Sequence, residues 1–178
     1  VVLLLRGGLA STAVAPMEVF AAAGVLWNKL ADQETRPLFK VQTASISGDA
    51  VEPDGPLSLV PVRSIASIRK VDLILVPATG LALDQLLARH GELVPWLQRW
   101  HRRGAAIAGV CSGVALLAEA GLLDGKPATT HWGLAEIYAK KYPRVDWRPE
   151  QFITDAGNVY CGGGVYASLD LSLYLVEP

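Results

Sequence analysis

A cysteine flanked by glycines is the part of this sequence whose residue types most clearly allow chemistry. The run Gly109-Val110-Cys111-Ser112-Gly113 joins an apolar segment typical of a strand, Ala105–Val110, to one typical of a buried helix, Ser112–Ala120. In the G-x-S-x-G nucleophile elbow, the same order of strand, sharp turn and helix lifts the central residue above the sheet in a strained conformation. The pattern therefore predicts a nucleophile elbow with Cys111 at its tip.

The helix predicted after this turn would affect the ionisation of the Cys111 thiol. Its positive end would point at Cys111 and favour the thiolate. The first amides of the helix, at Ser112, would form a cradle for an oxyanion together with backbone N–H groups around Thr79 and Gly80. The alternative is a small buried cysteine in an ordinary tight turn. Strand, glycines and helix fall in register, which favours the elbow.

The elements that would position the elbow alternate between strands and helices. Short apolar runs predict strands at Val1–Leu5, Leu38–Ala44, Val71–Val76, Ala105–Val110, Ala128–Thr130, Phe152–Thr154 and Val159–Cys161. Helical spacing of apolar residues predicts helices from the Ser11-Thr12 turn to about Gly24 and over Glu92–Arg102, Ser112–Ala120, Leu134–Lys141 and Val165–Val176. Ser45–Ser67 is expected to be a loop with short strands. This order predicts an α/β fold, a flavodoxin-like three-layer sandwich with a mainly parallel sheet.

Composition limits the class of protein. The 178 residues are 51% apolar, enough for one core, so residues 1–178 are expected to form a single domain. A net charge of −1 lacks the footprint of a nucleic-acid-binding surface. Two cysteines without CxxC or Cys/His spacing predict neither a disulfide framework nor a metal site, and no cofactor motif is present. No apolar run approaches the ~20 residues of a membrane span, so we expect a cytoplasmic protein without membrane contact.

Several runs together resemble one family. These are Gly109–Gly113, Leu117–Gly125, Ala128–Trp132, Ala15–Phe20, Gly163–Val165, Leu169–Leu171 and Leu175–Glu177. They resemble the PfpI-like branch of the class I glutamine-amidotransferase-like superfamily, and more narrowly the amidase-like sensor domains at the amino end of AraC-type transcription regulators. The similarity spans essentially the whole chain. It implies a helix-turn-helix domain after residue 178 that would make any DNA contact, a small-molecule effector and a homodimer.

The resemblance also implies site residues. The elbow cysteine falls on Cys111, the polar residue after it on Ser112, and the nearby histidine on His131. Catalytic relatives carry Asp or Glu where this chain has Thr12, whose hydroxyl can donate a hydrogen bond but cannot act as a carboxylic acid near neutral pH. Protease-like relatives place His directly after the cysteine, and the glutaminases use a late His-x-Glu; neither pattern occurs here. The expected ligand site comprises Thr12, Thr79, Gly80, Cys111, Ser112 and His131.

Three functions remain open from the residues. The first is a sensor that binds a small molecule above Cys111 without turning it over. The second is a Cys-dependent hydrolase or hydratase of the PfpI or isonitrile hydratase type, in which His131 or water moves protons. The third is a redox or electrophile sensor. His131 is alternatively a structural residue fixed against Trp132, and His90 and His101 are expected to face solvent.

Overall fold

The fold is built on one twisted, mostly parallel sheet. We describe it from a computed structural model that defines residues 1–177. Seven strands follow the order β3-β2-β1-β4-β5-β9-β8, in which β8 alone runs antiparallel to its neighbour. Their bounds are β1 Val2–Leu3, β2 Thr43–Ser45, β3 Arg63–Ser64, β4 Leu73–Val76, β5 Ala106–Val110, β8 Ile153–Asp155 and β9 Val159–Gly162. The chain order reverses between β1 and β4, which is where ligands of such sheets bind, at the carboxyl edge.

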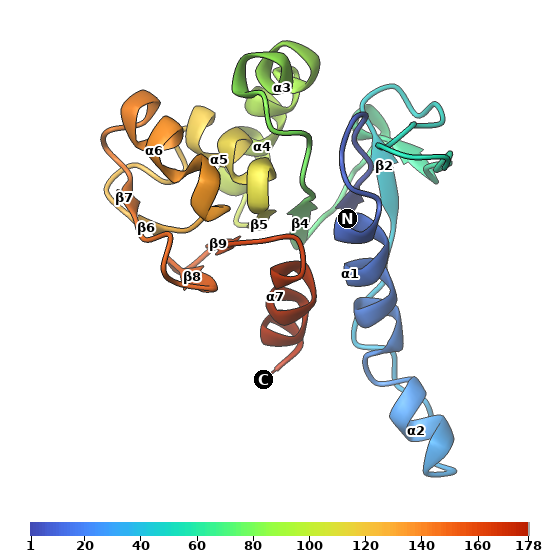
Figure 1. Cartoon of the computed structure of the whole chain (residues 1–178). Coiled ribbons are helices and arrows are strands. Elements are labelled where there is room, and N and C mark those ends of the chain that lie inside the picture. Colours follow the sequence, from blue (N-terminus) through green and yellow to red (C-terminus); the bar gives the residue numbers. More distant parts are fainter. Residues whose placement is uncertain (178) are drawn as a thin grey trace.

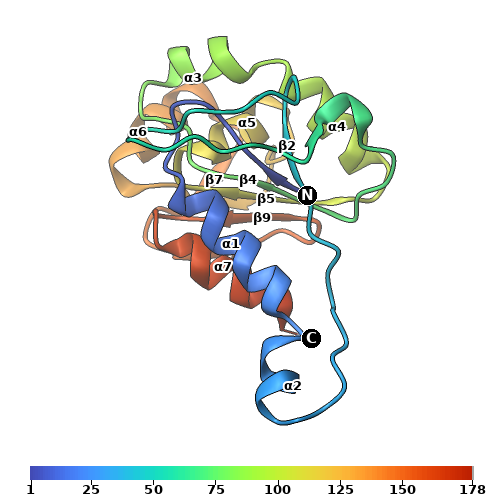
Figure 2. The ribbon, with the colours of Figure 1, turned by 90° about the vertical axis from the view of Figure 1, so that its right-hand side faces the viewer.

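Helices cover both faces of this sheet, as Figures 1 and 2 show. On one face lie α1 (Ser11–Ala22) and α7 (Ala167–Val176), which pack side by side. The other face carries α3 Leu83–His90, α4 Leu93–Arg102, α5 Val114–Glu119 and α6 Trp132–Lys141. The predicted three-layer α/β architecture is therefore confirmed.

Helix α4 shows how the apolar pattern sets the packing. Leu93, Trp96, Leu97 and Trp100 are all buried, at the spacing that places them on one face of the helix. The Trp96 indole N–H donates to the Ile65 carbonyl oxygen at 3.1 Å, so its polar atom is satisfied inside the core. These tryptophans belong to the core.

Several predicted elements differ in extent. The strand expected at Leu38–Ala44 is confined to β2, because Phe39 turns toward α1 and packs on Phe20 with ring centroids 5.0 Å apart. Of Ala128–Thr130, only the first residue is extended, in β6 (Pro127–Ala128), which pairs with β7 (Asp146–Trp147) in a separate two-stranded sheet. The short helices α2 (Leu26–Leu30) and α3 were not predicted.

Helix α2 projects from the body of the molecule at the end of α1 (Figures 1 and 2). Its apolar side chains Leu26, Trp27 and Leu30 are exposed, Trp27 by 75%. Within residues 1–177, no helix is both long and apolar enough to cross a membrane.

Candidate functional site

Cys111 occupies the strained elbow that the sequence predicts. Its φ is +53°, in the left-handed region that residues with a β-carbon rarely enter. It follows directly on β5 and begins a 3₁₀ turn, Cys111–Gly113, that leads into α5. The order of strand, strained residue and helix is thus confirmed.

The two flanking glycines are required for close packing. A β-carbon on Gly113 would lie 2.2 Å from the Pro77 carbonyl oxygen, and one on Gly109 would lie 3.1 Å from the Leu117 side chain. Neither glycine has a positive φ, so the sharp turn is made by Cys111 itself. The glycines permit the turn by letting the helix approach the sheet closely.

Buried hydrogen bonds from other segments hold the elbow. Thr130 Oγ1 donates to the Cys111 carbonyl oxygen at 2.8 Å, and the Tyr138 hydroxyl donates to the Ser112 carbonyl oxygen at 3.1 Å. The Thr79 N–H donates to Ser112 Oγ at 2.9 Å, across 33 positions of sequence. A strained residue persists when its surroundings over-determine it, and these bonds do so. Because the Thr79 amide is engaged, it is not free for the expected oxyanion cradle.

The thiol of Cys111 is covered. Its residue is 2% exposed and packs with Ala78, Val110 and Leu171. Burial raises the pKa of the Cys111 thiol, and hydrogen bonds from the Ser112 amide and hydroxyl offset part of that rise. The expectation of a thiolate favoured by a helix is therefore wrong for this conformation, since burial dominates and α5 is only six residues long. Cys161 is fully buried, and burial raises its pKa to about 12.

Thr12 lies near the elbow, but its hydroxyl bonds to Leu9 and Ala78 and not to the elbow residues. Its side chain is fully buried at the start of α1, where Oγ1 donates to the Leu9 carbonyl oxygen at 2.7 Å. The same oxygen accepts the Ala78 N–H at 3.1 Å. The hydroxyl proton is thus used within the first turn of the helix, and the oxygen ties α1 to the loop after β4.

His131 takes a capping role. It precedes α6, and its Nδ1 accepts the Gly133 N–H at 3.2 Å. The ring lies 5.3 Å from the Trp132 ring, in the structural arrangement that the sequence left open. Both rings line a cavity of about 400 Å³ whose rim includes the exposed aromatic residues Phe152 and Tyr166. The hydrogen bond from Thr130 nevertheless places the segment before His131 against the elbow.

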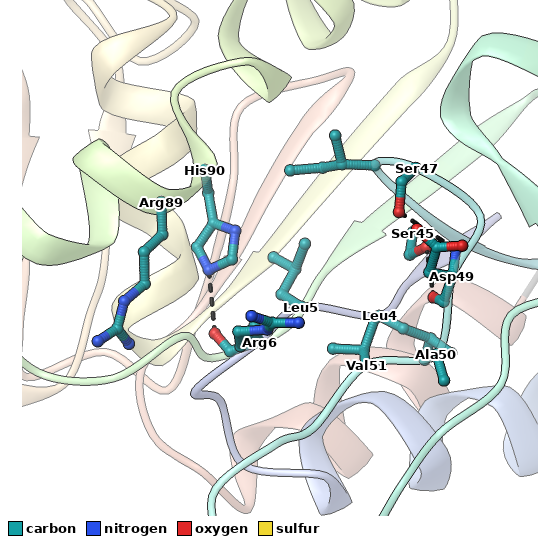
Figure 3. A pocket seen from close by; sticks show the side chains of 11 residues that line it. Leu4, Leu5, Arg6, Ser45, Ser47, Asp49, Ala50, Val51, Arg89 and His90 are labelled. Carbon is teal, nitrogen blue, oxygen red and sulfur yellow. Dashed lines mark hydrogen bonds between the residues drawn. The ribbon is translucent and has the colours of Figure 1, made fainter.

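A second cavity, of about 280 Å³, lies at the carboxyl ends of β1 and β2 (Figure 3). Its floor contains the apolar residues Leu4, Leu5 and Val51, and its rim contains Arg6 and Arg89. His90, predicted to face solvent, is only 3% exposed and lines this cavity. Its Nε2 is 3.0 Å from the Arg6 carbonyl oxygen, so Nε2 carries the proton and donates. This site could not be predicted from the sequence, because Arg6 and His90 are 84 positions apart.

Among residues 1–177, no three side chains of His, Cys, Asp or Glu gather closely enough to hold an ion.

Gly80, the remaining predicted ligand residue, has a φ of +79° and lies against the Gly7 carbonyl oxygen. The expected ligand residues other than His131 therefore lie along three adjoining segments at the carboxyl edge: the start of α1, the loop after β4 and the elbow.

The fold and the elbow define an α/β protein with a cysteine at the carboxyl edge of its sheet. The model of the DJ-1/PfpI family matches residues 2–178, and the chain belongs to that family. The HTH-type transcriptional regulator CdhR of Pseudomonas aeruginosa is 32% identical over 148 residues, which are 83% of this chain and 43% of CdhR. Isonitrile hydratase of Pseudomonas putida is 30% identical over 68% of this chain and 51% of the hydratase.

A solved structure supports the same fold. The crystal structure of an AraC family transcriptional regulator from Pseudomonas putida matches with a TM-score of 0.73 at 24% identity, covering 98% of this chain and 88% of that one. The chain spans about two fifths of the length of the curated regulators CdhR, GbdR and GlxA, between 37% and 43%. Its relatives thus include both helix-turn-helix regulators and an enzyme.

Proposed function

We propose that this chain is the effector-sensing domain of an AraC-type, cytoplasmic transcription regulator and that it does not turn its ligand over. The observation that carries the proposal is at Thr12. Where catalytic relatives have a carboxylic acid, this chain has a hydroxyl that is already engaged with Leu9 and Ala78. Without a neighbouring group that transfers protons, the elbow keeps its backbone conformation, but Cys111 lacks the partner that turnover requires. The regulators among the relatives support the sensing role.

The proposed effector site lies along the carboxyl edge of the sheet. It comprises Thr12, Thr79, Gly80, Cys111, Ser112 and His131, as the family resemblance implies. Thr79 supports this location because its Oγ1 is buried without a hydrogen-bond partner among the described residues. Such a group costs free energy until something satisfies it. Contact of an effector with Cys111 itself requires the covering segments to move, since the thiol is 2% exposed.

A homodimer is part of the proposal, with DNA bound through a helix-turn-helix domain that follows residue 178. Helix α2 supports dimerisation because its three apolar side chains are exposed on a projecting element. Changing Trp27 and Leu30 together to Ser should convert a dimer to a monomer in sedimentation experiments. If the double variant sediments like the unsubstituted protein, α2 is not part of the dimer interface.

Two experiments test the regulatory role. Reading the coding sequence for the hundred or so codons after residue 178 should reveal a helix-turn-helix, and a stop codon there would contradict the proposal. The full-length protein should then bind DNA in an electrophoretic assay, and Cys111→Ser should retain that binding. Loss of DNA binding in a folded Cys111→Ser protein would assign the thiol a role that we do not expect.

The alternative is a Cys-dependent hydrolase or hydratase, favoured by the strained φ of +53° at Cys111 and by the isonitrile hydratase relative. We expect no appreciable turnover of isonitriles, amides or glyoxals. Turnover above ~1 s⁻¹, the low end for enzymes, that disappears in Cys111→Ala would establish the alternative instead.

A further inference from the structure

The cavity beside His90 has the composition of a site for a small organic acid. It opens at the carboxyl edge between β1 and β2, and the last residues of α3 form one of its walls (Figure 3). Its volume of about 280 Å³ is at the lower end of the range for small-molecule sites. The floor of Leu4, Leu5 and Val51 is apolar and buried. This combination suits a ligand with a short hydrocarbon part and a polar head.

The charges at the rim favour an anionic head. Arg6 follows β1 and Arg89 ends α3, and within residues 1–177 neither guanidinium has a carboxylate within ion-pair distance. Both cations are close enough to His90 to lower its pKa further, after the larger effect of burial. Asp49 also lines the cavity, but its one negative charge is outnumbered by the two positive charges of the arginines. A guanidinium binds a carboxylate with two parallel hydrogen bonds, which a free arginine at a rim can offer.

The His90 ring adds a specific requirement. Because Nε2–H donates to the Arg6 carbonyl oxygen, the neutral ring presents Nδ1 as an acceptor, and this atom is buried without a partner among the described residues. Figure 3 shows Nδ1 on the side of the ring where Leu5 and Ser47 lie. A buried acceptor of this kind calls for a donor. A hydroxyl is a donor small enough to approach this buried atom, and to reach Nδ1 it would have to displace a neighbouring side chain.

We infer that this cavity binds a small hydroxy acid, whose carboxylate pairs with Arg6, whose hydroxyl donates to His90 Nδ1, and whose alkyl part covers Leu5 and Val51. Arg89 contributes charge from the rim. The inference does not depend on the regulatory role of the chain, since it concerns binding to the chain itself.

The test uses 2-hydroxyisovalerate as the probe and the 178-residue chain as the receptor. Titration followed by NMR should show saturable binding with a dissociation constant on the order of 1 mM, as expected for a ligand of this size. Isovalerate, which lacks the hydroxyl, and 2-hydroxyisovaleramide, which lacks the charge, should each bind about tenfold more weakly. Inorganic phosphate, which also offers an anion and a donor, should bind more weakly than the hydroxy acid because it leaves the apolar floor uncovered.

Variants assign the contacts. Arg6→Met should weaken 2-hydroxyisovalerate at least tenfold and Arg89→Met a few-fold, while Arg102→Met, a matched exposed arginine on α4, should have no effect. Asp49→Asn should strengthen binding. His90→Gln keeps a donor for the Arg6 carbonyl oxygen but moves the acceptor from the Nδ1 position to an amide oxygen further along the side chain, so it should reduce the preference for 2-hydroxyisovalerate over isovalerate. Absence of saturable binding up to roughly 20 mM, tighter binding of phosphate, or affinity unchanged in Arg6→Met would each overturn the inference.

Discussion

Gly113→Ala should destabilise the protein strongly because the added methyl group meets backbone atoms. An alanine β-carbon would lie 2.2 Å from the Pro77 carbonyl oxygen and 2.9 Å from that of Val76. The shorter distance is ~1 Å below an ordinary carbon–oxygen contact. Both oxygens belong to the end of β4 and the residue after it, so no side-chain rotation relieves the contact. Relief requires α5 to move away from the sheet, and we expect unfolding to become easier by about 3 kcal/mol or more.

Urea denaturation followed by circular dichroism measures this effect. With the slope usual for a chain of this size, a loss of about 3 kcal/mol lowers the midpoint by about 1 M urea. Gly164→Ala is the matched control, because a β-carbon there has no atom within 4 Å and its φ is not in the left-handed region. That variant should unfold at the same midpoint or slightly above it. Equal midpoints for the two variants would refute the close contact between the elbow and β4.

Three further predictions address the elbow and its surroundings. Tyr138→Phe should lower the free energy of unfolding by about 1 kcal/mol, because it removes the buried hydrogen bond to Ser112; an unchanged urea midpoint would show that the bond is not needed. Burial lowers the pKa of His90, so the unfolded chain takes up a proton near pH 6.5 that the fold does not, and stability should fall below that pH by at most roughly 1.4 kcal/mol per unit. His90→Gln should reduce this loss between pH 6.5 and 5.5, and equal slopes in urea titrations would contradict it. Iodoacetamide should modify Cys111 faster than Cys161, whose pKa is raised to about 12, as mass spectrometry of timed samples would show; the reverse order would count against the elbow.

The elements that the sequence predicted well are those whose pattern is local. The continuous apolar runs ending at Val76 and Val110 became the central strands β4 and β5, since strands buried on both faces need apolar residues at every position. The glycine–cysteine turn is equally local, because strand, bend and helix are adjacent in the chain. Helix α3 was missed because its apolar face is short, with only Leu83, Leu86 and His90 buried.

The surroundings of the site could not be predicted because they depend on contacts between distant segments. Burial of Cys111 comes from α7 and from the loop after β4, neither of which is near it in sequence. The same holds for His90, whose charged neighbours Arg89 and Glu92 suggested a solvated position. It is buried because α3 ends against the loop that contains Arg6.

The cavity and the elbow are joined by a continuous set of close contacts. The loop after β1 packs on the loop after β4: a β-carbon on Gly8 would lie 2.0 Å from the Ala78 carbonyl oxygen. The next residue of that second loop, Thr79, donates its N–H to Ser112 of the elbow. Contacts as tight as these do not deform gradually. A displacement of the loop after β1 therefore either moves the loop after β4 with it or is opposed by both loops together. Arg6 lies two residues before Gly8, so the cavity and the elbow share one packed set of loops at the carboxyl edge of the sheet.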